Sequence, residues 1–194
     1  MGTIDMEPIH LKIKEGAKPK HSKPYPVPKA FEKLKKKKCL RFCDIGVLEE
    51  ANHSQWAAPS FIQQKKTGDA QVLTDFCELN KVLILKSYPL PKIQDLPLKM
   101  GKLKYATALD LYMGYYHIPL DKYSQNLCTT ILPWGKFKYQ KLPMGIVLAP
   151  DIFQEVTNKL LGDLNYVTVY IDDIIIIQKE DESDESRLEK IEFV

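Results

Sequence analysis

The sequence has few of the residues that build cross-linked or zinc-bound proteins. Its 194 residues include only four cysteines and four histidines. Cys39 and Cys43 have the spacing of two zinc ligands on one helical turn, but no second Cys/His pair follows at a finger-like spacing, which argues against a zinc finger. No secretory signal precedes the cysteines, so we expect reduced thiols and an intracellular protein, without distinguishing a cytoplasmic particle from the nucleus.

Long apolar runs and a dominant charge are also lacking. No run approaches the roughly twenty apolar residues of a membrane-spanning helix, so we expect a soluble protein of one or two domains with no membrane partner. The net charge is only +3, yet residues 10–41 hold twelve Lys or Arg against two acidic residues. In residues 179–192, acidic residues outnumber basic ones seven to three. This asymmetry indicates a basic surface for a polyanion, or simply a solvated helix face and a frayed end.

The most informative motif is the tetrad Tyr170-Ile-Asp-Asp173. It lies between two short apolar runs rich in β-branched residues, which predict a hairpin with the carboxylates at its bend. Adjacent carboxylates repel each other and are costly to bury, and a bound divalent cation reverses that cost. Strand alternation predicts Tyr170 and Asp172 on one face. The alternative is an ordinary acidic turn on the surface.

A third carboxylate, Asp110, ends another predicted strand. Alternation over residues 105–110 places Ala106, Ala108 and Asp110 on one face, where small neighbours admit a close partner. An Asp at a strand end beside an Asp-Asp hairpin is suited to hold two Mg²⁺ ions, completed by water and substrate phosphates. Because two such ions promote in-line phosphoryl displacement, the sequence suggests nucleotidyl transfer.

Local patterns predict the remaining elements. Prolines favour an extended segment before residue 29, and a helix with a solvated lysine-rich face is expected over residues 30–41. Strands are predicted at 56–63 and 70–74 with a turn at 65–69, and at 129–139 with a turn at 133–135. Helices are predicted at 92–100, at 114–118 and from Pro150 onward. The last has an apolar stripe of Ile152, Phe153, Val156, Leu160 and Leu161.

Seven motifs occur in the order seen in reverse transcriptases, and the chain most resembles the gypsy-type branch of LTR retrotransposons. They are Trp56–Phe61, Thr74–Lys81, Tyr88–Ile93, Ala108–Ile118, Leu142–Gly145, Ala149–Gln154 and Tyr170–Asp173. The resemblance implies an α/β fold, the fingers and palm of a right-hand polymerase, in which an antiparallel palm sheet is backed by helices. It implies an extended basic segment at 1–28, fingers at 29–104 interleaved with a palm at 105–178, and an acidic, poorly ordered tail at 179–194.

The resemblance also implies an RNA-directed DNA polymerase, a nucleotidyltransferase that adds deoxynucleotides to a primer 3′-hydroxyl on a template. Asp110, Asp172 and Asp173 would be catalytic and, with the backbone oxygen of Leu111, would hold two Mg²⁺ ions, for which Mn²⁺ is an alternative. Asp110 and Asp172 would be the more direct ligands. The implied deoxynucleotide contacts are Lys65, Lys66, Gln71, Leu111, Tyr115, Met144 and Gly145. The implied template–primer contacts are Tyr170 and Gln154, and Phe153 and Gln154 would also support the pocket from the helix behind it.

Several of these roles compete with simpler ones. Tyr115 matches the aromatic gate that excludes a ribose 2′-hydroxyl, but it also fits a core aromatic. Met144, where many retroviral relatives have Gln, also fits as packing. Lys65 and Lys66 match basic residues that approach the triphosphate, or are solvated turn lysines.

Two departures from the family pattern weaken the resemblance. Gln71 and Cys77 stand where the family usually has Arg, and neither supplies a guanidinium to a phosphate. The chain also stops shortly after the tetrad, so we expect the thumb, ribonuclease H and integrase regions of an intact polyprotein to lie outside it. The alternatives are a degenerate or domesticated retrotransposon fragment without useful polymerase activity, and a non-catalytic basic nucleic-acid-binding module.

Overall fold

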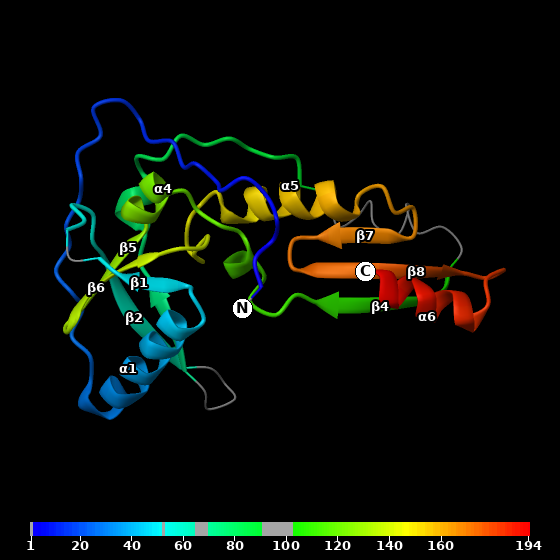
Figure 1. The fold of residues 1–194 in the computed structure, drawn as a ribbon, viewed down its shortest axis with the longest axis horizontal. Helices are drawn as coiled ribbons and strands as arrows, with labels where there is room; N and C mark the ends of the chain where they lie inside the picture. The colour runs from blue at the N-terminus through cyan, green and yellow to red at the C-terminus, as the bar shows by residue number, and fades with distance from the viewer. Residues whose placement is uncertain (1, 52, 65–69, 91–102) are drawn as a thin grey trace. The chain divides into compact units, whose positions relative to one another are not determined.

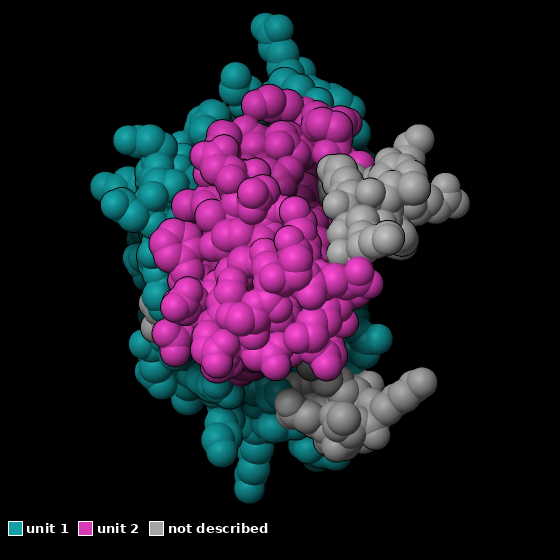
Figure 2. Space-filling model, turned by 90° about the vertical axis from the view of Figure 1, so that its right-hand side faces the viewer, with its two compact units in different colours: residues 1–85, 115–149 teal, residues 86–114, 150–194 magenta. Residues whose placement is uncertain are grey.

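The computed structural model describes residues 2–51, 53–64, 70–90 and 103–194 (Figure 1). The chain forms two compact units, each built from two separate stretches of sequence (Figure 2). The first unit contains residues 1–85 and 115–149, and the second contains residues 86–114 and 150–194. The expected boundary between residues 104 and 105 therefore does not coincide with this division, because residues 115–149 belong with the N-terminal stretch.

The first unit is built on a five-stranded sheet with the order β1-β6-β5-β2-β3. Its strands are β1 (Leu48–Glu50), β2 (Ala58–Gln64), β3 (Ala70–Thr74), β5 (Thr129–Leu132) and β6 (Gly135–Tyr139). Among these strands, as far as the structure describes them, only the β2–β5 pair is parallel. Both expected hairpins, β2–β3 and β5–β6, are present, and the turn expected at 65–69 lies outside the described residues.

Helices complete the first unit. They are α1 (Lys29–Asp44), α2 (Cys77–Asn80), the 3-10 helix η2 (Gly114–His117), whose first residue lies in the second unit, and α4 (Lys122–Leu127). α4 begins after Asp121, whose Oδ1 accepts the backbone N–H of Ser124 at 2.8 Å, a standard N-cap. The helix expected at 92–100 lies outside the described residues. None of the described helices is long and apolar enough to cross a membrane.

Lys35 corrects the expectation that the lysine-rich face of α1 is wholly solvated. Its side chain is only 1% exposed, and its Nζ donates to the backbone oxygen of Ser60 on β2 at 2.7 Å. Burial lowers the pKa of Lys35 to about 8. Cys39 lies one turn further along and is also buried, so these two positions form the inward face of the helix.

The second unit is built on a three-stranded antiparallel sheet with the order β4-β8-β7. The strands are β4 (Leu103–Asp110), β7 (Val167–Tyr170) and β8 (Asp173–Lys179), and the helices are α5 (Ala149–Leu161), which begins one residue before this unit, and α6 (Asp184–Phe193). Val169, Ile174 and Ile176 form the core of the unit, and Leu161 of α5 and Ile191 of α6 pack against it.

The apolar stripe expected on α5 is correct except at its end. Phe153 and Val156 are buried, whereas Leu160 is 56% exposed. Leu161 takes the core position in the last turn, and Leu160 lies about 100° away around the helix axis. One leucine of the final pair therefore faces outward.

Residues 184–193 of the acidic segment 179–194 form the helix α6, whereas a poorly ordered tail was expected. α6 begins after Ser183, whose Oγ accepts the backbone N–H of Ser186 at 3.2 Å. Lys190 Nζ lies 2.6 Å from the carboxylate of Glu182, which offsets part of the negative charge. The sequence-based expectation counted the net charge of the segment and not the cap and ion pair that order it.

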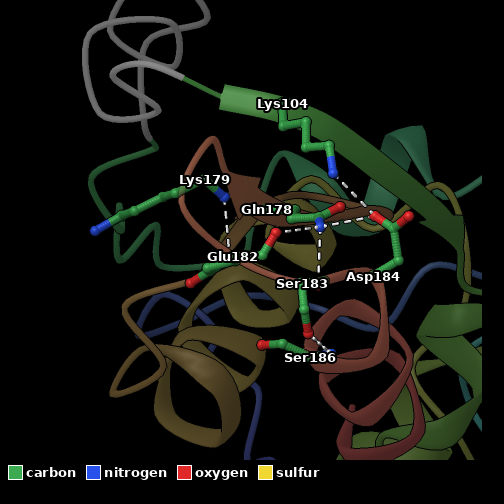
Figure 3. A network of polar contacts seen from close by, with 7 residues as sticks. All are labelled: Lys104, Gln178, Lys179, Glu182, Ser183, Asp184 and Ser186. Carbon is green, nitrogen blue, oxygen red and sulfur yellow. Dashed lines mark hydrogen bonds and ion pairs between the residues drawn. The ribbon is translucent and has the colours of Figure 1, made fainter.

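Gln178 fastens this segment to the end of β8 (Figure 3). Its side chain is 0% exposed, and its Nε2 donates to the backbone oxygens of Glu182 and Ser183 and to Oδ1 of Asp184 at 2.9–3.1 Å. Lys104 of β4 also reaches the Asp184 carboxylate at 3.2 Å. The start of α6 is thereby tied to two strands of the sheet.

Candidate active site

Two of the three predicted catalytic carboxylates lie in a row across the sheet of the second unit. The strand register pairs Asp110 on β4 with Asp173 on β8, and Asp173 with Tyr170 on β7. Residues directly opposite each other on antiparallel strands point to the same face, so the side chains of Asp110, Asp173 and Tyr170 are neighbours. Ala108, two residues before Asp110, shares this face and leaves room beside the carboxylates.

The third carboxylate, Asp172, lies in the two-residue turn Ile171–Asp172 between β7 and β8. This turn ends the strand alternation. Tyr170 therefore shares a face with Asp173, and the prediction that it shares one with Asp172 is wrong. The Asp172 carboxyl is close enough to both other carboxylates to interact electrostatically. Burial first, then the charges of Asp110 and Asp173, raise its pKa above the ordinary value.

One oxygen of Asp172 suggests what this cluster accommodates. Its Oδ1 is buried and has no hydrogen-bond partner among the described residues. A buried, unpartnered carboxylate oxygen near two like charges is costly, and a divalent cation offsets that cost. The donor set of carboxylate oxygens is the set that Mg²⁺ prefers. The residues therefore fit the ion.

The cluster is not a closed metal cage. Within the described parts of the chain, no group of three or more His, Cys, Asp or Glu side chains is gathered tightly enough to hold a metal ion alone. Mg²⁺ rarely uses such cages, because it retains waters and binds substrate phosphates beside one or two carboxylates. An open carboxylate cluster is therefore compatible with an ion that arrives with a nucleotide.

Backbone contacts fix the end of β4 to the turn. The N–H of Leu111 donates to the carbonyl of Asp172 at 3.2 Å. The carbonyl of Leu111, a predicted metal ligand, accepts the N–H of Gly114 at 3.1 Å and retains a second lone pair. A Cβ at Gly114 would lie 2.8 Å from Cζ of Phe153, so only glycine fits there without a shift.

Of the two roles expected for Gln154, its burial favours support of the site over contact with a template–primer. Its side chain on α5 is 0% exposed, so it does not present a surface to a template–primer. Its Oε1 accepts the N–H of Ile171 at 2.8 Å, and its Nε2 donates to the carbonyl of Val169 at 3.1 Å. The side chain supports the carboxylate hairpin instead.

The predicted nucleotide contacts in the first unit are only partly described, since Lys65 and Lys66 lie outside the described residues. Gln71 on β3 donates from Nε2 to Sδ of Met144 at 3.5 Å. Tyr115 is half-buried, whereas its neighbour Tyr116 is 4% exposed and is the core aromatic of the pair.

Asn80 is a residue of this unit that the sequence reading left without a role. Its Nδ2 donates to the carbonyl of Gly145 at 2.8 Å, and its Oδ1 accepts the N–H of Val147 at 3.0 Å. Gly145 has a φ of +94°, a conformation that favours glycine. Asn80 therefore holds the end of the Leu142–Gly145 motif, and its place inside the Thr74–Lys81 motif was the only signal in the sequence.

A cavity of about 480 Å³ lies elsewhere in the first unit, with Trp56, Tyr123 and Lys138 among its lining residues. It contains none of the predicted site residues. Its lining has one carboxylate, Glu50, and so lacks the carboxylate cluster that divalent cations favour.

Comparison with known proteins identifies the family of the chain. The sequence profile of the family described as "Reverse transcriptase (RNA-dependent DNA polymerase)" matches residues 62–192. The chain is 30% identical to the Retrovirus-related Pol polyprotein from transposon 297 of Drosophila melanogaster, over 81% of this chain and 16% of that protein. It is 30% identical to the corresponding polyprotein from transposon gypsy of the same organism, over 95% of this chain and 17% of that protein.

A solved structure agrees in fold. A mutant protease–reverse transcriptase of prototype foamy virus superposes with a TM-score of 0.85 at 25% identity, over 98% of this chain and 25% of that one. The chain thus spans about a sixth of the length of the two polyproteins and a quarter of the viral protein.

Proposed function

Because the chain belongs to the reverse transcriptase family, we propose that it supplies the fingers and palm of an RNA-directed DNA polymerase. The reaction is the template-directed addition of deoxynucleotides to a primer 3′-hydroxyl. The observation that carries this proposal is the cluster of Asp110, Asp172 and Asp173 with the unpartnered Oδ1 of Asp172.

In this proposal Asp110 and Asp172 are the direct ligands of two Mg²⁺ ions, for which Mn²⁺ is an alternative. The chemistry that the ions supply when bound is activation of the primer hydroxyl and stabilisation of the leaving oxygen. Asp173, exposed and opposite Asp110, adds negative charge to the cluster. The carbonyl of Leu111, held by its contact with Gly114, presents its second lone pair as a further ligand.

The proposal assigns substrate contacts residue by residue. Tyr115 excludes a ribose 2′-hydroxyl, Met144 and Gly145 border the nucleotide, and Tyr170 contacts the template–primer from the carboxylate face of the sheet. Lys65 or Lys66 approaches the triphosphate. In this proposal the thumb and the ribonuclease H and integrase activities belong to other regions of the intact polyprotein.

A second candidate function is nucleic-acid binding without useful polymerisation. The amide of Gln71 supports it, because a neutral side chain stands where the family usually has a guanidinium. The amide contacts the Met144 sulfur at 3.5 Å, a weak acceptor. In that case the basic segment 10–41 would retain binding, with a steep dependence on salt.

The deciding experiment is single-nucleotide addition by the purified chain to a primed RNA template in Mg²⁺. Addition that Asp110→Asn abolishes and Glu180→Gln preserves is the expected result. Glu180 is an exposed acid at the other end of the sheet and controls for loss of one charge. Binding of primer–template without any addition would favour the second function. Addition that persists in Asp110→Asn would refute the carboxylate assignment.

A further inference from the structure

The turn that carries Asp172 has an unfavourable backbone. Ile171 has a φ of +52°, in the left-handed region that β-branched residues rarely adopt. A two-residue hairpin turn requires a positive φ at this position, and glycine ordinarily supplies it. A strained conformation of this kind persists only when surrounding contacts determine it, and such strain clusters at functional sites.

One side of the turn is held by one buried side chain of α5. The amide of Gln154 accepts the N–H of Ile171 at 2.8 Å and donates to the carbonyl of Val169 at 3.1 Å. Its Nε2 also donates to Oδ1 of Asn158 at 3.0 Å, and Asn158 donates to the hydroxyl of Tyr88 at 3.2 Å. This chain of contacts fixes the orientation of the Gln154 amide.

The other side of the turn is held by β4, through the N–H of Leu111 and the carbonyl of Asp172 at 3.2 Å. Asp172 directly follows Ile171, so a rotation of the Ile171 backbone displaces its carboxylate from Asp110. The side chain of Gln154 is thus the contact from α5 that sets where the Asp172 carboxylate lies.

We propose that Gln154 is a positioning residue that holds Ile171 in its left-handed conformation and thereby places the Asp172 carboxylate beside Asp110 for metal binding. The inference rests on the proposed function, because it gives Asp172 a metal to bind. It assigns Gln154 no contact with substrate. Outer residues that orient metal ligands commonly change metal affinity by roughly ten- to a hundredfold when they are replaced.

The alternative is that Gln154 merely stabilises the fold, and the chain offers a matched control. Gln178 is equally buried, lies in the same unit and donates to three acceptors at the far end of β8 (Figure 3). Replacing either glutamine by methionine removes an amide of similar size from a buried site. Only Gln154→Met removes the contact with the turn.

The test compares Gln154→Met, Gln178→Met and the unaltered full chain by two measurements that require no catalysis. The first is amide hydrogen exchange at Ile171, where we expect protection to fall roughly tenfold in Gln154→Met alone. The second is the affinity for Mn²⁺, followed by the electron paramagnetic resonance of the free ion. We expect it to fall roughly tenfold or more in Gln154→Met and to change little in Gln178→Met.

A second variant separates positioning from general loss of stability. Glycine at position 171 adopts a positive φ without strain. Ile171→Gly should therefore restore Mn²⁺ affinity when it is combined with Gln154→Met. It should not restore Mn²⁺ affinity when it is combined with Asp172→Asn. Unchanged exchange at Ile171, equal losses in the two methionine variants, or no rescue by glycine would overturn the proposal. A chain that binds Mn²⁺ as described but adds no nucleotide would count against the proposed function alone.

Discussion

Asp110 and Asp173 are directly opposite each other at the end of the β4–β8 register, and Asp172 adjoins them in the turn. Like charges in opposed positions destabilise a sheet, and partial burial of Asp172 adds to that cost. A cation bound to the folded chain would offset the repulsion. Folding stability and metal binding are therefore expected to be linked.

Asp172→Asn should make the metal-free chain more stable. The raised pKa means that the folded chain favours the protonated form of Asp172, so ionisation of this carboxyl lowers folding stability. The loss of stability grows as the pH rises through the pKa of Asp172 in the unfolded chain and then through its pKa in the folded chain. The gain should be present at neutral pH, reduced by solvent screening, and it should vanish in acid. Thermal unfolding with a chelator measures it, with the exposed Asp173→Asn as the comparison. A less stable Asp172→Asn at neutral pH would contradict this account.

The three carboxylates should differ in their importance for nucleotide addition. We expect Asp110→Asn and Asp172→Asn to abolish Mg²⁺-dependent addition and Asp173→Asn to reduce it less, since Asp173 is exposed and its charge affects the Asp172 carboxyl less than that of Asp110 does. Removing a direct metal ligand should cost several orders of magnitude in rate, at 1.36 kcal/mol for each factor of ten. Single-turnover rates at saturating nucleotide give the comparison. A loss at Asp173 as large as the other two would make it an equal ligand.

Tyr115→Val should raise the use of ribonucleotides relative to deoxynucleotides. A smaller side chain would leave space for a 2′-hydroxyl beside the sugar, and filling or emptying such a space is worth roughly ten- to two-hundredfold in selectivity. The ratio of kcat/KM for the two nucleotide types is the measurement, and Tyr123→Val, an exposed tyrosine on α4, is the control. If selectivity does not change in a variant that still extends primers, Tyr115 serves only in packing.

Local signals in the sequence predicted much of this fold. The β5–β6 hairpin, the β7–β8 hairpin and α5 follow from runs of β-branched residues, a Pro-Trp-Gly turn and a helical apolar stripe. These features depend on residues close together in the chain, so their patterns survive in any tertiary context. Strand alternation likewise predicts that Ala106, Ala108 and Asp110 lie on one face of β4.

Contacts between distant segments were not predictable. The burial of Lys35 depends on a carbonyl of β2, and the role of Asn80 depends on a loop 65 to 67 residues further along the chain. The pattern around Gln154 implied a supporting position behind the pocket, but not that its amide contacts the backbone of Ile171 and Val169. Polar residues of this kind carry no periodic signal, and only the tertiary structure reveals their partners.

Lys35 should make stability depend on pH in a narrow range. Its folded pKa of about 8 lies below the ordinary value of 10.5, so the unfolded chain binds more protons between these values and stability rises with pH. Buried Cys39, whose pKa is raised to about 12 from 9.0, acts in the opposite direction above pH 9. The rise should therefore be clearest between pH 8 and 9.

Urea unfolding at these two pH values tests the assignment. We expect Lys35→Met to remove the rise, and Lys37→Met, on the exposed side of the same helix, to retain it. The full effect of one titrating group cannot exceed about 1.4 kcal/mol per pH unit, so the difference should be below that limit. A rise that persists in Lys35→Met would assign it to another group.

Gln71 and Cys77 give the last prediction, which separates nucleotide capture from retention of the primer–template. The amide of Gln71 contacts the Met144 sulfur, and Cys77 is exposed, with its backbone N–H bound to the carboxylate of Asp75 at 3.0 Å. Neither side chain supplies a positive charge. Replacing both by arginine should add a charge-assisted contact worth about 1.5–3 kcal/mol, or roughly ten- to a hundredfold in the first addition.

The gain should appear as faster single-nucleotide addition at saturating primer–template, while product length should change little, because residence on the duplex depends on a different clamp. Gln55→Arg adds the same charge at an exposed position outside the predicted site and controls for general attraction to nucleic acid. Fusion of a thumb from a related polymerase should do the opposite, lengthening products with little change in the first addition. Long products made by the unaltered 194 residues at physiological salt would show that neither arginines at these two positions nor an added thumb is needed for sustained synthesis.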